Sequence, residues 1–249
     1  MSKISELIEN LNIPDPNSIG FNSNKDIKKY PHMILITYLD MKKPFDLEVL
    51  KYSDAIILKN LNKCDSLQPI KKLKVILGLE IYDNSNSDLN FLEKNNFDFI
   101  VFASDNVNAD LLLSKNISTA YFIPSIISDD KGACIEEVGF DFLIIKNDSI
   151  SFPLKISHLL KIQEMVLKNS GNIFMYSNSL PSFSDLELLR KSNISGFAVD
   201  GNGISLKQIQ TLHNQILKLK PSDSNDNSFN SPLLPNLSDN QQLDDYDDE

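Results

Sequence analysis

Eight short apolar segments, separated by longer amphipathic stretches, constrain the fold of this chain more than any other feature. They are rich in β-branched and aromatic residues and span 33–39, 54–59, 74–81, 98–103, 118–123, 141–146, 172–177 and 195–200. Apolar and polar residues do not alternate cleanly within them, which is typical of strands buried on both faces. We therefore predict eight parallel strands joined by right-handed crossover connections.

The stretches between these segments predict helices. After the last strand, Ser205 is placed to cap a helix with an apolar stripe through Leu206, Ile209, Leu212 and Ile216. Ser184 and Glu187 have the spacing of a capping box at the start of another helix. Ser87 and Asn108 are the predicted caps of the helices that follow the third and fourth strands.

Every second strand lies in the same sequence frame, which indicates an internal repeat. The frame reads SDAIILKN at 53–60, FDFIVFAS at 97–104, FDFLIIKN at 140–147 and ISGFAVDG at 194–201. The strand starts are 44, 43 and 54 residues apart, close to the length of one β-α-β-α unit. Four such units close a (β/α)8 barrel. An open flavodoxin-like or Rossmann sheet is the alternative, although no GxGxxG follows the first strand.

The segments FDFIVF at 97–102 and ISGFAVD at 194–200 resemble the helix–strand junctions of aldolase-type TIM barrels. The resemblance extends over residues 30–220 and implies a single α/β domain, a (β/α)8 barrel similar to uncharacterised bacterial barrel proteins. It brings no complete active-site motif, so it implies an architecture and not an activity. Residues 1–30 are then expected to form an N-terminal helix and loop that pack on a barrel of residues 31–220.

Residues 221–249 are predicted to form a disordered acidic tail. They hold eight acidic residues and no basic one; the whole chain has a formal charge of −10, so residues 1–220 carry −2. This polar composition cannot bury enough apolar surface to offset the entropy lost on ordering. The apolar stretch SPLLPNL at 231–237 is a candidate to dock on the barrel or on a protein partner. The alternative, which we favour, is a solubilising tail with an incidental apolar stretch.

Charge, hydropathy and cysteine usage exclude several classes of partner. The nearly neutral residues 1–220 lack the basic surface that nucleic acids or anionic lipids require. No apolar run reaches the ~18 residues of a transmembrane helix, and the first 30 residues show no secretory signal. Cys64 and Cys134 lie far apart and form no disulfide or zinc pattern. We expect a cytoplasmic protein without nucleic-acid or membrane partners.

Polar residues end most of the predicted strands, and barrel active sites lie at these carboxyl ends. Lys146 ends the sixth strand, where the resemblance to aldolase-type barrels implies Schiff-base chemistry. Burial lowers the pKa of an amine and frees its lone pair to attack a carbonyl. Glu80 is the candidate general acid or base, and Lys59 and Asp200 are candidates to assist proton transfer. The alternative is a set of solvated rim residues, which would also include Tyr38, Asp40, Asn60, Ser104, Asp105, Ser125, Asn147, Ser177, Asn178 and Asn202.

A second candidate site is the segment after the eighth strand. Gly201 and Gly203, followed by a helix that begins after Ser205, could offer backbone N–H groups to a phosphate or another anion. The loop after the seventh strand has no glycine, however, and a turn before a capped helix explains the same residues. Arg190 is the only arginine and the chain has only eight glycines, which further disfavours a clamped phosphate.

No metal or cofactor is predicted. His32, His158 and His213 lie before a strand or within helices, so no histidine ends a strand. A carboxylate site for Mg²⁺ from Asp40, Glu80 and Asp200 is a weaker possibility that no spacing demands. We interpret the aromatic residues of the strands as core; these are Phe99, Phe102, Tyr121, Phe122 and Phe142.

Two hypotheses about function follow. The first is a barrel without catalysis, or a degenerate one, that binds a small ligand at its mouth or a protein partner. The second is an aldolase-class lyase or isomerase acting on a small carbonyl compound through Lys146. Short connections, few glycines, a single arginine and the absence of a histidine at the strand ends favour the first.

Overall fold

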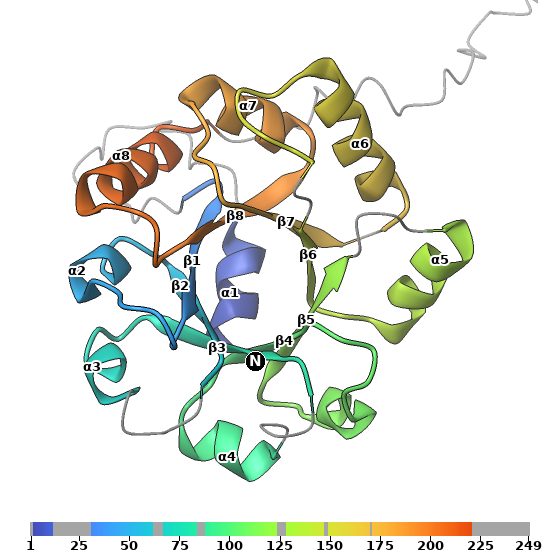
Figure 1. The fold of residues 1–249 in the computed structure, drawn as a ribbon. Helices are drawn as coiled ribbons and strands as arrows, with labels where there is room; N and C mark the ends of the chain where they lie inside the picture. Colours follow the sequence, from blue (N-terminus) through green and yellow to red (C-terminus); the bar gives the residue numbers. More distant parts are fainter. Residues whose placement is uncertain are drawn as a thin grey trace, which may run out of the picture.

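The computed structural model describes residues 2–11, 31–61, 67–83, 88–123, 128–146, 149–169 and 171–220. Eight parallel strands form one closed barrel in chain order (Figure 1). They are β1 (Ile34–Asp40), β2 (Ala55–Lys59), β3 (Ile76–Ile81), β4 (Phe99–Phe102), β5 (Ser118–Ile123), β6 (Phe142–Lys146), β7 (Asn172–Ser177) and β8 (Ile194–Asp200). The (β/α)8 prediction is confirmed, and the open sheet is excluded because β1 pairs with both β2 and β8.

Helices of unequal length surround the barrel. The first half carries α2 (Leu47–Leu50), α3 (Gln68–Lys71), α4 (Leu89–Lys94) and the 3₁₀ helix η3 (Ala109–Leu113). The second half carries α5 (Asp129–Val138), α6 (Ile156–Leu167), α7 (Phe183–Lys191) and α8 (Leu206–Ile216). The first four have four to six residues each and the last four nine to twelve. The helices around the first half of the barrel are therefore shorter than those around the second half.

The helix caps were predicted only in part. Ser205 caps α8 as predicted. The capping box of α7 is formed by Ser182 and Asp185, so the predicted pair two residues later is wrong. Asp185 is buried and also accepts a 2.8 Å hydrogen bond from the backbone N–H of Leu154, and this second contact fixes the earlier start.

The helices after β3 and β4 also begin differently from the prediction. Asp88 caps α4 by accepting a hydrogen bond from the N–H of Asn90, and Ser87 lies outside the described residues. Asn108 does hold the N-cap position of η3, but its side chain makes no capping bond.

Aromatic rings fill the inside of the barrel. Phe99, Phe142 and Phe174 are completely buried, with ring centroids 5.5 Å apart for the first pair and 4.8 Å for the second. A Cβ atom on Gly78 would lie 2.2 Å from the ring of Phe99, so glycine is required there to admit that ring. The interior is thus a packed core and not a channel.

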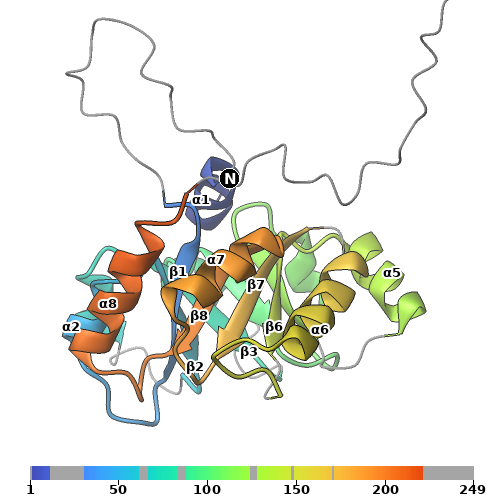
Figure 2. The same ribbon diagram turned by 90° about the horizontal axis from the view of Figure 1, so that it is seen from above.

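Helix α1 (Lys3–Asn10) lies across the amino-terminal end of the barrel (Figure 2). Its apolar residues Ile4 and Ile8 are buried against the barrel interior. The carboxylate of Asp98, just before β4, accepts hydrogen bonds from the N–H groups of Lys3 at 2.8 Å and Ile4 at 2.7 Å. An acidic group at a helix N-terminus satisfies orphan donors and complements the helix dipole.

The aspartates of the repeated frame have a structural role. Asp54 accepts a 2.8 Å hydrogen bond from the N–H of Leu35, and Asp141 accepts one of 2.7 Å from Thr119. Each thus ties the start of an even-numbered strand to the strand before it. Asp98 occupies the equivalent position but binds α1 instead.

Two sequence predictions fall on segments without a described structure. The predicted loop after α1 corresponds to residues 12–30, and the predicted tail to 221–249; both lie outside the described residues. Within the described part of the chain, no helix combines the length and the apolar character needed to span a bilayer.

Candidate functional site

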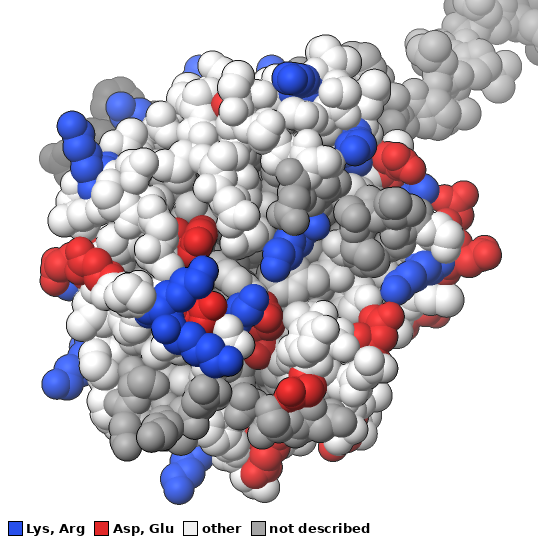
Figure 3. Space-filling view, viewed as in Figure 1, with Lys and Arg blue, Asp and Glu red and all other residues white. Residues whose placement is uncertain are grey.

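The predicted site residues project toward the inside of the barrel at its carboxyl-terminal end. Side chains alternate along a strand, so Lys59, Glu80, Lys146 and Asp200 share the inward face with Ile57, Gly78, Ile144 and Ala198, respectively. Figure 1 looks into this end, with α1 at the far end of the barrel. Figure 3 shows basic and acidic side chains close together around the centre of the same face. We call this region the mouth.

The floor of the mouth is formed by Tyr38, Glu80, Phe122 and Tyr176, one inward residue from each odd-numbered strand. The rings of Tyr38 and Tyr176 meet edge to face with centroids 5.1 Å apart, and those of Tyr38 and Phe122 lie 6.1 Å apart. Residues far apart in sequence thus form one aromatic layer with a single carboxyl group.

Lys146 lies over this floor. Its Nζ atom is 5.8, 5.6 and 5.4 Å from the ring centroids of Tyr38, Phe122 and Tyr176, respectively. These are cation–π distances. Within the described parts of the chain, no hydrogen bond or ion pair holds this ammonium group, and the side chain is exposed. It is therefore held by ring faces and by the nearby charge of Glu80.

Burial raises the pKa of Glu80 to about 7, although the positive charge of Lys146 opposes this shift. Desolvation penalises the carboxylate more than the neutral acid. Near neutral pH, both forms of Glu80 are populated, so this side chain can take up or release a proton there.

The hydroxyl group of Tyr38 is the unsatisfied polar group of the floor. Tyr38 is only 5% exposed, and its Oη has no hydrogen-bond partner among the described residues. By contrast, the hydroxyl of Tyr176 donates a 2.7 Å hydrogen bond to Asn178. A buried polar atom without a partner costs free energy of folding.

The carboxylates on the rim are engaged by neighbouring loops. Burial would raise the pKa of Asp40, but hydrogen bonds from Asn60 and from the N–H of Lys42, with the charge of Lys59, hold it below its ordinary value. Asp200 accepts a 3.0 Å hydrogen bond from the N–H of Asn202. The structure thus brings Lys146 close to Glu80, whereas the charge of Lys59 acts on Asp40.

The segment predicted to bind an anion is engaged in local contacts. The N–H and hydroxyl of Ser205 both donate to the side-chain oxygen of Gln208 in the capping box of α8. Gly201 packs so closely that a Cβ atom would lie 2.3 Å from the Thr37 methyl group. Gly203 is open, with the carboxyl of Asp200 as its nearest neighbour. Anion binding here remains a prediction.

The histidines play packing and capping roles. His158 is 9% exposed, and its Nδ1 accepts a 3.3 Å hydrogen bond from the N–H of Lys155 at the start of α6. The ring of His213 packs against Tyr52 with centroids 5.9 Å apart. Among the described residues, no group of three or more potential ligands is arranged to hold a metal ion.

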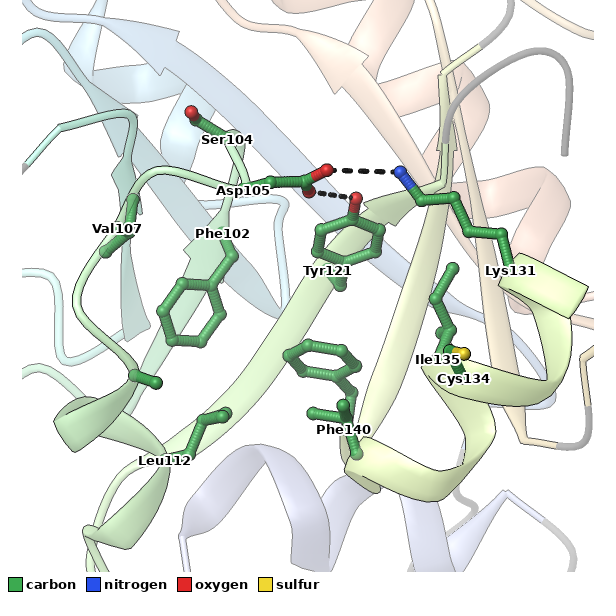
Figure 4. Close-up of a pocket in the computed structure, with 12 residues that line it drawn as sticks. Phe102, Ser104, Asp105, Val107, Leu112, Tyr121, Lys131, Cys134, Ile135 and Phe140 are labelled. Atoms are coloured by element: carbon green, nitrogen blue, oxygen red, sulfur yellow. Dashed lines mark hydrogen bonds and ion pairs between the residues drawn. The ribbon is translucent and has the colours of Figure 1, made fainter.

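A cavity lies outside the barrel wall, between η3 and α5 (Figure 4). It has a volume of about 280 Å³ and an apolar lining that includes Phe102, Leu112, Ile135 and Phe140. Sequence reasoning assigned Phe102 and Tyr121 only to the core, and both are indeed buried. The sequence predicted a helix after Asn108, whereas the structure forms the five-residue 3₁₀ helix η3 there, next to the cavity.

One edge of this outer pocket is polar. The hydroxyl of Tyr121 donates a 2.6 Å hydrogen bond to Asp105, and Lys131 binds the other carboxylate oxygen at 3.1 Å. The Tyr121 hydrogen bond, followed by that from Lys131, lowers the pKa of Asp105. Burial, followed by the bond to Asp105, raises the pKa of Tyr121.

The closed barrel of eight parallel strands places this protein in the class of (β/α)8 barrels. A mutant tryptophan synthase alpha-subunit from Pyrococcus furiosus is similar with a TM-score of 0.56, 12% identity, and coverage of 74% of this chain and 96% of that chain. A ligand-free mutant tryptophan synthase structure from M. tuberculosis has a TM-score of 0.56 at 9% identity, with coverage of 87% and 98%. No protein-family model and no curated protein matches the sequence. These likenesses therefore show the fold alone.

Proposed function

We propose that this protein binds a small molecule at the carboxyl-terminal mouth of its barrel and does not catalyse a reaction on it. The observation that carries the proposal is the position of Lys146 above three aromatic rings and beside Glu80. Such an arrangement of charge and apolar surface around one opening is typical of ligand sites in barrels.

The surroundings of Lys146 favour binding over nucleophilic attack. A lysine attacks a carbonyl only as the neutral amine. The ring faces of Tyr38, Phe122 and Tyr176 attract the ammonium form, as does the ionised form of Glu80. The rim carboxylates of Asp40 and Asp200 already accept hydrogen bonds from the loops, which leaves few groups for proton transfer.

The proposal is tested by the thermal unfolding of the full-length protein in the presence of small cationic, anionic and neutral compounds. A ligand that binds the folded state raises the unfolding midpoint. We expect at least one class to do so, with a response that changes in Lys146→Met and is kept in Lys131→Met, a control at the outer pocket. A response abolished by Lys131→Met and unaffected by Lys146→Met contradicts binding at the mouth.

The pKa of Glu80 supports a second candidate, a lyase or isomerase acting on a small carbonyl compound. In that reaction the neutral amine of Lys146 forms a C–N bond with the carbonyl carbon. The nitrogen gives up its two protons, the carbonyl oxygen takes up two and leaves as water, and a C=N bond remains. An acid with a pKa of about 7 is suited to that proton transfer. Lys59 and Asp200 are the further residues that this candidate assigns to proton transfer.

Borohydride trapping distinguishes the two functions. The protein is incubated with small aldehydes and keto acids, reduced, and weighed intact before the modified residue is mapped. Binding without catalysis predicts no reduced adduct at Lys146, with Lys146→Met giving the background. An adduct at Lys146 that is absent from Lys146→Met would overturn the binding proposal in favour of the lyase.

Two further expectations belong to this proposal. A reducing compartment such as the cytoplasm suits it, because Cys134 carries an exposed free thiol. A protein partner for the segment 231–237 remains a prediction, since that segment lies outside the described residues.

A further inference from the structure

The floor of the mouth has the composition of a site for an organic cation. Tyr38, Phe122 and Tyr176 present their rings around a single nitrogen atom, the Nζ of Lys146, at 5.4 to 5.8 Å. Aromatic cages of this kind recognise alkylammonium and quaternary ammonium groups through the negative faces of their rings. Lys146 thus marks the place where a positive charge is stabilised.

Glu80 supplies the complementary negative charge. It belongs to the same layer as the three rings, and its electrostatic interaction with Lys146 shows that it lies near the cation position. An aromatic cage with one carboxylate binds a cation more strongly than rings alone, because the carboxylate neutralises the desolvated charge. Both components of such a site therefore occur together in this floor.

The Lys146 ammonium can be exchanged for another cation. Its side chain is exposed, it ends β6, and among the described residues no hydrogen bond or ion pair fixes its ammonium group. A flexible four-carbon stem can turn into solvent, where the ammonium is well hydrated. The charge that occupies the cage is therefore replaceable at small cost.

We propose that the mouth binds a small organic cation carrying a hydroxyl group, which displaces the ammonium of Lys146 from the ring cage. The inference rests on the proposed binding function and names the ligand class. The cation occupies the space over Tyr38, Phe122 and Tyr176. Its hydroxyl group meets the buried, unpartnered hydroxyl of Tyr38, which neither an apolar ligand nor a simple quaternary ammonium such as tetramethylammonium would satisfy.

Binding is measured by NMR titration of the full-length protein with three probes: tetramethylammonium, choline, and 3,3-dimethylbutanol as the neutral isostere of choline. Lys146→Met removes the internal cation but keeps the length of the side chain, and Lys131→Met, at the outer pocket, is the matched control. We expect choline to bind Lys146→Met about tenfold more tightly than wild type, a difference of about 1.4 kcal/mol. Lys131→Met should match wild type. Circular dichroism and the thermal midpoint verify folding, with Lys146→Gln as the second variant if Lys146→Met is unstable.

Two further variants test the roles of the floor residues. In the Lys146→Met background, Glu80→Gln should weaken the binding of both cations, because the carboxylate is lost. Tyr38→Phe should weaken choline and leave tetramethylammonium unchanged, because only choline carries the hydroxyl group. Upfield ring-current shifts of the N-methyl protons would locate the cation against the rings.

The outcomes separate this inference from the proposed function. If neither cation binds Lys146→Met at millimolar concentration, or if the neutral isostere binds as well as choline, the cation site is wrong. Should an anionic or neutral compound nevertheless raise the unfolding midpoint in a manner sensitive to Lys146→Met, the binding function stands without it. If no compound of any class responds to Lys146→Met, both are wrong.

Discussion

The aromatic rings in the floor of the mouth have different effects on the ammonium group of Lys146 and on the carboxyl group of Glu80. The ring faces stabilise the ammonium of Lys146, which remains exposed on its other side. The same layer desolvates the carboxyl of Glu80, so its pKa rises to about 7 even with a positive charge nearby. Proton exchange at neutral pH is thus a property of Glu80.

The raised pKa of Glu80 predicts a specific pH dependence of stability. The folded protein holds this proton up to a pKa of about 7, whereas the unfolded chain releases it near the ordinary pKa of 4.5. The stabilisation is therefore complete below pH 4.5 and is lost as the pH rises through 7. Relative to Glu80→Gln, the wild type should lose roughly 3 kcal/mol between pH 4.5 and 8.

Urea unfolding of both proteins at several pH values measures this loss. Asp54, whose pKa is also raised by burial, is unchanged in Glu80→Gln and cancels in the comparison. Parallel stability curves for the two proteins over this range would show that the folded environment does not retain the Glu80 proton.

Tyr38 and Tyr176 form a matched pair for a second prediction. Tyr38→Phe removes a buried hydroxyl without a partner and should raise the free energy of unfolding by about 1 kcal/mol. Tyr176→Phe removes a hydroxyl bonded to Asn178 and should lower it by about 1 kcal/mol. Chemical denaturation of the ligand-free proteins distinguishes the two. A loss of stability in Tyr38→Phe would mean that its hydroxyl is already satisfied.

At the scale of the elements, α1 acts as part of the barrel core. Ile4 is fully buried against the interior residues of the barrel, and Asp98 fixes the start of the helix. Ile4→Ala should therefore lower the free energy of unfolding by about 2–4 kcal/mol. Glu9→Ala, on the exposed side of the same helix, should change it by less than about 0.5 kcal/mol. Equal effects of the two in denaturant titrations would show that α1 does not contribute to the core.

The strands could be predicted because their residues carry the signal themselves. Each predicted strand lies within two residues of the observed one, since burial on both faces demands an unbroken apolar run. Strands that alternate with helices along the chain are parallel, so their carboxyl ends lie together. Lys146 and Glu80 could therefore be placed at the same end of the barrel. Asp98 could be recognised as part of the repeat, but its bond to α1 depends on a contact across 95 residues.

The cap of α7 and the aromatic floor of the mouth could not be predicted from the sequence. The start of α7 depends on the contact between Asp185 and Leu154, which are 31 residues apart. The cage around Lys146 depends on barrel closure, which places rings from β1, β5 and β7 in one layer. The sequence analysis assigned Phe122 to the core and Tyr38 to the rim, and only the arrangement of both with Tyr176 shows that the three rings surround a charge.

For the molecule as a whole, the interior rings link distant strands into one cooperative unit. Phe99 of β4 and Phe142 of β6 contact each other with ring centroids 5.5 Å apart. Phe99→Leu and Phe142→Leu should each lower the free energy of unfolding by about 1 kcal/mol, with a coupling of about 0.5–1.5 kcal/mol. Urea titrations of the single and double variants give the coupling. The pair Phe142→Leu and Leu189→Ala, in the separate inner and outer cores, is the additive control.

Because α1 covers the amino-terminal end of the barrel, a ligand can enter and leave only at the carboxyl-terminal end of the described structure. Among the described residues, α1 covers the amino-terminal end and rings pack below the floor, so a molecule that binds the mouth as proposed would leave through the same end by which it entered. One ligand must then dissociate before the next can bind. The dissociation rate of the bound ligand therefore limits the rate at which it is exchanged for another.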